Sequence, residues 1–161
     1  MNSSLFSHAE QPEPAKETVS VPDVVVERIV PRELHEAFNG FTEYIHLWWP
    51  EEFTDFGEGT HPEFESGALT ESGPAGQISL WATVTSRVQD TEIVLDWVQG
   101  HAAQTPTEVR ISFTPVDAET TRVTLVHSGF GAVAEPGETQ KKFSEAWPLI
   151  TERYARFMGA R

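Results

Sequence analysis

The chain has 161 residues, of which 39% are hydrophobic, and this is enough apolar material for one domain with a sizeable core. It contains no cysteine, which excludes disulfides, thiolate metal sites and cysteine nucleophiles. A formal net charge of −14 argues against attraction to nucleic acid or to an anionic membrane surface, and no apolar run approaches the roughly 18 residues of a membrane span.

Residues 1–21 are predicted to form a flexible acidic tail, because they combine Ser, Glu, Pro and Ala with few large apolar groups. They lack the basic start and the apolar stretch of a secretion signal, so we expect a cytoplasmic protein. Residues 22–161 contain neither an internal repeat nor a boundary between domains, and they are predicted to form a single domain.

A run of β-branched residues predicts the first strand at Val24–Val30. The apolar spacing then becomes helical over residues 31–39, and Gly40 is predicted to close this helix. A second short helix is expected at 42–48, because Pro50 follows it closely. The chain therefore begins with one strand and two short helices.

Six further strands are predicted before the last segment of the chain. The longer ones alternate apolar and polar residues, which is typical of an antiparallel sheet with one wet face. The predicted spans are 60–65, 68–71, 77–88, 92–98, 108–114 and 122–127. Because Ile78 and Leu80 follow the inward phase of the span 77–88, Trp81 is predicted to point away from the core. An exposed Trp81 would mark a protein interface, whereas cover by the tail or by a loop would make it structural, and the two are weighted equally.

Residues 138–158 carry the one sustained helical stripe of the chain. Its large apolar residues recur every three or four positions: Phe143, Trp147, Ile150, Tyr154 and Phe157. Pro148 lies inside the stripe, and because the phase does not change there, a kinked helix is favoured over a broken one. A sheet and one aromatic helix can each cover the other's apolar face, so the fold class is α+β.

Four local features occur in this order: VERIVPRELHEAF at 26–38, the pair Trp48-Trp49, VTLVHSGF at 123–130, and Trp147 in the last helix. As a set they resemble the START-like, helix-grip superfamily, and more narrowly the domain related to the C-terminal part of the activator of Hsp90 ATPase. The resemblance covers roughly residues 21–158. It implies a curved antiparallel sheet of six to seven strands gripping the long helix, with a cavity that takes a lipid, a hormone or a polyketide.

Given that fold, ten residues are predicted to line a hydrophobic ligand cavity between the sheet and the helix. They are Trp48, Trp49, Phe53, Trp97, Phe113, His127, Phe143, Trp147, Ile150 and Tyr154. The alternative is an ordinary packed core, since protein interiors are normally filled. The core is favoured for any single residue, and a cavity is favoured for the set.

His127 continues the inward phase of Val123 and Leu125, so its imidazole is expected among apolar groups. It could orient a ligand, or act as acid or base in a cyclase or hydrolase of the kind found in the superfamily. The favoured alternative is a buried histidine that bonds to a backbone carbonyl or to Tyr154. Because no carboxylate has a spacing that would fix it beside His127, no catalytic residue is assigned.

His61, Glu63 and Glu65 alternate along one strand and could hold a metal, but a solvated strand face is favoured, so neither a metal nor a cofactor is expected. The interval between Arg32 and Arg87 contains no Lys or Arg. Its acidic residues are Glu33, Glu36, Glu43, Glu51, Glu52, Asp55, Glu58, Glu63, Glu65 and Glu71. They form either a docking face for a basic protein partner or, as we favour, an acidic surface that opposes association.

Three functions are compatible with these features. The first is binding of a small hydrophobic molecule in the cavity, without nucleic-acid or membrane partners. The second is a chaperone-interacting module that uses the acidic face, as the resemblance to the Hsp90 activator implies. The third is an enzyme that uses His127, and it ranks last because a single histidine without a fixed partner supports it.

Overall fold

The computed structural model describes residues 20–100 and 105–161, so the tail predicted at 1–21 falls almost entirely outside the described residues. In chain order the elements are β1 (Val24–Val30), α1 (Leu34–Thr42), α2 (Ile45–Trp48), the 3-10 turn η2 (Glu51–Phe53), β2 (His61–Glu65), β3 (Ala68–Ser72), β4 (Ile78–Val88), β5 (Glu92–Trp97), β6 (Thr107–Asp117), β7 (Thr120–Ser128), the 3-10 turn η3 (Phe130–Ala132) and α3 (Pro136–Phe157). None of the helices in this part of the chain combines the length and the apolar character needed to cross a membrane.

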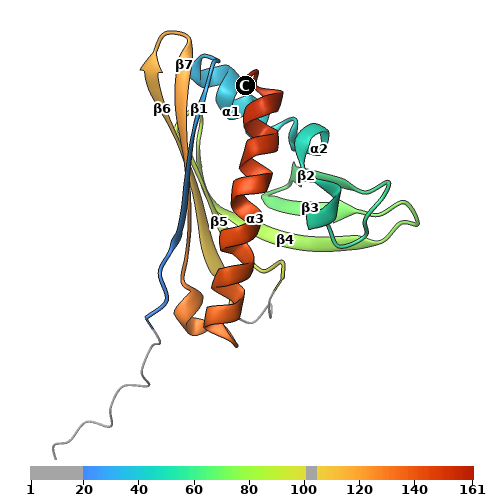
Figure 1. The fold of residues 1–161 in the computed structure, drawn as a ribbon. Coiled ribbons are helices and arrows are strands. Elements are labelled where there is room, and N and C mark those ends of the chain that lie inside the picture. Colours follow the sequence, from blue (N-terminus) through green and yellow to red (C-terminus); the bar gives the residue numbers. More distant parts are fainter. Residues whose placement is uncertain (1–19, 101–104) are drawn as a thin grey trace, which may run out of the picture.

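The strands form one antiparallel sheet in the order β1-β7-β6-β5-β4-β3-β2. The first strand therefore pairs with the last, while the other strands follow one another as hairpins. Figure 1 shows the sheet curling around α3, with α1 and α2 lying near one end of that helix. The predicted α+β architecture, a curved sheet that grips one long C-terminal helix, is confirmed.

Helix α3 passes through Pro148 without a break, as predicted. Two side chains support the backbone at this point. The guanidinium of Arg28 on β1 donates from Nη2 to the carbonyl of Pro148 at 2.7 Å, and the hydroxyl of Thr151 donates to the carbonyl of Trp147 at 2.8 Å. Four residues of the predicted stripe are buried, but Phe157 is 38% exposed, because it lies at the end of the helix beside Tyr44 rather than over the sheet.

The prediction that Gly40 closes the first helix is wrong, since α1 continues to Thr42. The absence of a side chain at this position instead leaves room for the side chain of Met158. A Cβ at this position would lie 2.4 Å from Cε of Met158, which follows the end of α3. The carbonyl of Gly40 also accepts a hydrogen bond from the indole Nε1 of Trp48 at 2.8 Å. Met158 thus packs against α1 at this position, whereas the hydrogen bond to the carbonyl does not depend on the residue type.

The register of β3 against β4 contains a bulge at Trp81. Leu69 pairs with Ala82 and Thr70 pairs with Leu80, so Trp81 is the extra residue of β4. An extra residue reverses the faces of the residues before it relative to those after it. The single alternating phase predicted for this strand therefore does not hold along its whole length.

Because of the bulge, the predicted placement of Trp81 away from the core is wrong. Its side chain has no exposed surface, whereas Ile78 and Leu80, predicted to face inward, are 68% and 49% exposed. The ring of Trp81 lies 4.8 Å from that of Trp49 and 6.3 Å from that of Trp97, measured between centroids. Trp81 is thus part of the core and not of an exposed interface.

Candidate functional site

A pocket of about 150 Å³ lies between the end of β5, the middle of α3 and the segment around η2. Its lining is mixed, with aromatic and aliphatic side chains together with polar ones. The lining residues are Trp49, Glu52, Phe53, Thr54, Asp55, Trp97, Gln99, Gly100, Lys142, Phe143, Ala146, Trp147 and Ile150. The site is therefore assembled from three segments that are far apart in sequence.

The apolar wall of the pocket is formed by packed aromatic rings. The centroids of Trp97 on β5 and Trp147 on α3 are 5.3 Å apart, and Phe143 stacks on Trp147 at 6.2 Å. Trp49, which follows α2, meets Trp147 edge-on at 5.9 Å. Faces and edges of these rings are suited to contact with another planar ring.

One side of the pocket mouth is held by hydrogen bonds among Trp49, Phe53 in η2 and the residues at the end of β5. The carbonyl of Phe53 accepts from the indole of Trp49 at 3.0 Å and from the amide of Gln99 at 3.2 Å. The indole of Trp97 donates to the carbonyl of Gln99 at 3.1 Å. On the other side, the ammonium of Lys142 lies 5.7 Å from the ring centroid of Phe143.

The structure brings six of the ten predicted ligand-binding residues together in this pocket. They are Trp49, Phe53, Trp97, Phe143, Trp147 and Ile150. The other four, Trp48, Phe113, His127 and Tyr154, are buried in the core and do not line the pocket. The prediction of ligand contacts at these four positions finds no support in the pocket geometry.

Tyr154 fills the core next to the first two helices. Its hydroxyl donates to the carbonyl of Ala37 in α1 at 2.7 Å, and its ring lies 5.2 Å from that of Trp48. Burial raises the pKa of Tyr154 far above the ordinary value of tyrosine, because the protein interior disfavours the phenolate. This side chain therefore remains a neutral hydrogen-bond donor.

His127 has no exposed surface and both of its ring nitrogens are engaged. The indole Nε1 of Trp147 donates to Nδ1 at 2.9 Å, and Thr107 Oγ1 lies 2.7 Å from Nε2. Because an indole can only donate, Nδ1 is the acceptor, and the proton of the neutral ring is on Nε2, which donates to Thr107. The histidine is thus satisfied within the core, by different partners from the backbone carbonyl or Tyr154 that the sequence suggested.

Glu71 on β3 is completely buried, a placement that was not predicted from the sequence. One carboxylate oxygen accepts from the backbone N–H of Asp55 at 2.7 Å and from the indole of Trp81 at 3.0 Å. The other accepts from the backbone N–H of Phe56 at 2.9 Å and from the hydroxyl of Thr60. A signal was present, because Glu71 follows Leu69 by two residues and therefore shares its inward face.

The remaining nine acidic residues between Arg32 and Arg87 are exposed or half-exposed, whereas Glu71 and Trp81 are buried and cannot contribute to an acidic docking face. On β2, Nε2 of His61 lies 3.5 Å from a carboxylate oxygen of Glu63. Within residues 20–100 and 105–161, no three His, Cys, Asp or Glu side chains are arranged to hold a metal ion.

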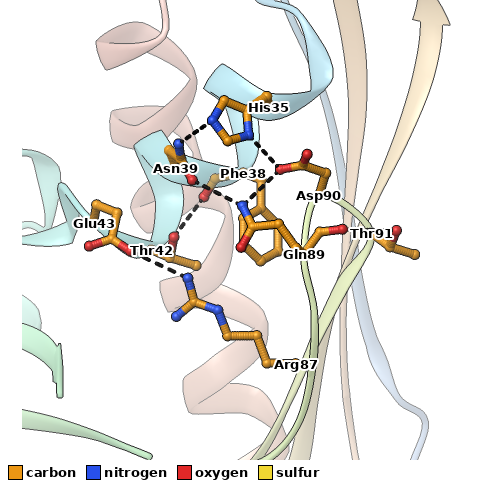
Figure 2. A network of polar contacts seen from close by, with 9 residues as sticks. All are labelled: His35, Phe38, Asn39, Thr42, Glu43, Arg87, Gln89, Asp90 and Thr91. Atoms are coloured by element: carbon orange, nitrogen blue, oxygen red, sulfur yellow. Dashed lines mark hydrogen bonds and ion pairs between the residues drawn. The ribbon is translucent and has the colours of Figure 1, made fainter. Parts of the chain in front are cut away.

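A second polar cluster lies away from the pocket, between α1 and the β4–β5 hairpin. Nδ1 of His35 lies 2.9 Å from a carboxylate oxygen of Asp90, and Nε2 of the same ring lies 3.0 Å from the amide nitrogen of Asn39. Gln89 donates to both Asn39 and Asp90 (Figure 2). These side chains are exposed or half-buried, and their hydrogen bonds connect the hairpin to the helix.

The fold and the pocket place the protein in the START-like, helix-grip class. Within that class, residues 31–158 match the family described as Activator of Hsp90 ATPase homolog 1-like protein, and the chain belongs to this family. The match covers most of the described residues, from the residue after β1 to the residue after α3. No curated protein sequence matches the chain.

Several solved structures share the fold at low sequence identity. Protein MLL2253 from Mesorhizobium loti is 18% identical with a TM-score of 0.60, over 85% of this chain and 96% of that one. CalC from Micromonospora echinospora, a self-sacrificing resistance protein, is 18% identical with a TM-score of 0.61, over 85% and 94%. The Aha1 dimer from Colwellia psychrerythraea is 12% identical with a TM-score of 0.58, over 86% and 96%. At these identities the likeness concerns the fold alone.

Proposed function

We propose that this protein binds a small, ring-containing apolar molecule in the pocket between β5 and α3. The observation that carries the proposal is that six residues expected to contact a ligand line one pocket of about 150 Å³. Ligand sites are typically concave and mainly apolar, with a few polar groups that fix orientation. This pocket has aromatic walls and polar groups around Glu52, Asp55, Gln99 and Lys142.

The volume of the pocket supports a ligand of limited size. An apolar cavity of about 150 Å³ accommodates a molecule such as benzene. Long fatty acids and sterols would need more space than the pocket offers in this conformation. We therefore expect one aromatic ring to pack against the wall formed by Trp97 and Trp147, with any polar substituent directed towards the mouth.

The hydrogen bonding of the core supports an apolar ligand as well. In the described part of the chain, every buried side-chain nitrogen or oxygen has a hydrogen-bond partner. The pocket floor therefore does not require hydrogen bonds from the ligand, and burial of apolar surface would provide most of the binding free energy.

The experiment is a ligand screen on the purified protein. Binding is detected as a change in intrinsic tryptophan fluorescence and in melting temperature. The panel contains single-ring aromatics, flavonoids, polyketide-like aromatics, fatty acids and sterols. A ligand at 100 times its dissociation constant should raise the free energy of unfolding by about 2.7 kcal/mol. Single-ring aromatics should give the clearest shift, and a panel without any shift would refute the proposal.

A second candidate function is modulation of a chaperone, which the family description and the nine surface carboxylates between Arg32 and Arg87 favour. The test is the ATPase rate of purified Hsp90 with and without this protein, in low and high salt. Stimulation that declines at high salt would support the candidate, because salt screens contacts between exposed charges. An unchanged ATPase rate at both salt concentrations would count against it. Catalysis by His127 ranks below both, since His127 does not line the pocket.

A further inference from the structure

Glu71 combines two properties that are seldom found together. It is completely buried, and no Lys or Arg forms an ion pair with it within residues 20–100 and 105–161. Its two oxygens instead accept four hydrogen bonds, from Asp55, Phe56, Thr60 and Trp81. A carboxylate has about four acceptor sites, so the acceptor capacity of Glu71 is fully used. A buried charge is retained when such bonds compensate for lost hydration.

The donors to Glu71 include one residue that lines the pocket and one that packs behind its aromatic wall. Asp55 lines the pocket mouth, and its backbone N–H and that of Phe56 are held by the two carboxylate oxygens. Trp81 does not line the pocket, but its ring packs against Trp49 and Trp97, which do. Glu71 therefore holds residues 54–60, the mouth segment, and it also bonds to Trp81, which packs behind the aromatic wall.

We propose that Glu71 is a positioning residue that sets the upper size limit of the ligand. It keeps residues 54–60 close to the end of β5 and keeps Trp81 pressed against the wall, so that the pocket stays near 150 Å³. The inference rests on the proposed binding function and adds a determinant of specificity to it. A ligand with two fused rings would have to displace the mouth segment, and the four hydrogen bonds to Glu71 oppose this movement.

The substitution Glu71→Gln tests the proposal with little change in volume. An amide has one oxygen and an NH₂ group, so its two N–H donors would face groups that are themselves donors. At least one pair of contacts must then break, and the mouth segment or Trp81 is released. Thr60→Val is a milder variant, because it leaves the carboxylate intact and removes one hydroxyl, which donates to Glu71 and lies 3.2 Å from the carbonyl of Ser72. Glu63→Gln is the control, since Glu63 lies half-exposed on β2 and is paired with His61 alone.

Binding of phenol, 1-naphthol and 9-phenanthrol would be measured by calorimetry for the four proteins. The wild type and Glu63→Gln should prefer phenol, whereas Glu71→Gln should shift the ratio of naphthol to phenol affinity at least tenfold towards naphthol. Thr60→Val should shift it in the same direction by a smaller factor. An unchanged ratio in both folded variants would overturn the proposal.

Hydrogen exchange separates this inference from the binding function. The backbone N–H groups of Asp55 and Phe56 should exchange at least tenfold faster in Glu71→Gln than in the wild type or in Glu63→Gln. If neither these phenols nor any compound of the screening panel binds the wild type, the proposed function fails, and the positioning role is judged by exchange alone. Unaltered exchange at both residues would then refute that role. If Glu71→Gln does not fold, Thr60→Val provides the same two measurements.

Discussion

The indole N–H of Trp147 donates to Nδ1 of His127 at 2.9 Å, and the hydrogen bonding continues from there across the core. Nε2 of His127 donates to the hydroxyl of Thr107 at 2.7 Å, and that hydroxyl lies 3.3 Å from the carbonyl of Trp97. The chain of bonds begins and ends at the two tryptophans that pack edge-to-face in the pocket wall. A buried histidine thus links α3 to β5 through β7 and β6.

Replacing Trp147 with Phe should lower the free energy of unfolding by about 1–3 kcal/mol from the loss of the donor to His127, because a buried acceptor is left unsatisfied. Urea denaturation measures this change. In a His127→Leu background the same substitution should cost less, because the acceptor is absent. Equal costs in the two backgrounds would show that the hydrogen bond contributes nothing to stability.

Replacing Ala146 with Phe should block the pocket. Ala146 is buried on α3 and lines the pocket, so a phenyl ring there would occupy the space reserved for the ligand. We expect the affinity for single-ring aromatics to fall at least tenfold, while the melting temperature stays close to that of the wild type. Leu149→Phe is the matched control, because Leu149 is 50% exposed on another face of the same helix. Retained affinity in the Ala146 variant would place the ligand elsewhere.

Alkaline titration should reveal the environment of Tyr154. Burial raises the pKa of its phenol in the folded protein. The stability from the neutral phenol is therefore complete below about pH 10, where tyrosine ionises in an unfolded chain, and it is lost as the pH rises above that value. In Tyr44→Phe, which leaves Tyr154 as the sole tyrosine, phenolate absorbance should appear only together with unfolding. Absorbance that rises while the circular dichroism stays native would contradict this.

Asp90 in the turn between β4 and β5 has a φ of 62°, in the left-handed region. Asp90→Gly and Asp90→Ala both remove the carboxylate that accepts from His35 and Gln89, but only glycine adopts this conformation without strain. Asp90→Gly should therefore be more stable than Asp90→Ala by about 1 kcal/mol. Thermal denaturation compares the two variants, and equal melting temperatures would argue against strain at this position.

The elements that local sequence determines were predicted well. The bounds of β1 agree with the predicted Val24–Val30, because a β-branched run is followed directly by Pro31. The central stripe of α3 was also predicted, since the spacing of Phe143, Trp147 and Ile150 is helical and all three are buried. In both cases the pattern and its boundaries lie within one short segment.

The errors occurred where distant segments decide the outcome. Gly40 lies inside α1 and packs against Met158, which is more than a hundred residues away, rather than at the end of the helix. Trp81 faces inward because β4 contains a bulge against β3, and alternation alone cannot show an extra residue. Glu71 was counted with the surface charges, because its four donors are supplied by tertiary structure.

Strand β2 is an edge strand of the sheet, and its composition affects whether copies of the protein associate through that edge at high concentration. The strand has only five residues, its Pro62 offers no N–H to a neighbour, and Glu63 and Glu65 add negative charge along it. Such a strand is a poor template for the pairing of a further chain. The sequence of β2 therefore opposes the addition of unfolded or partly folded copies to a growing fibril at this edge of the sheet.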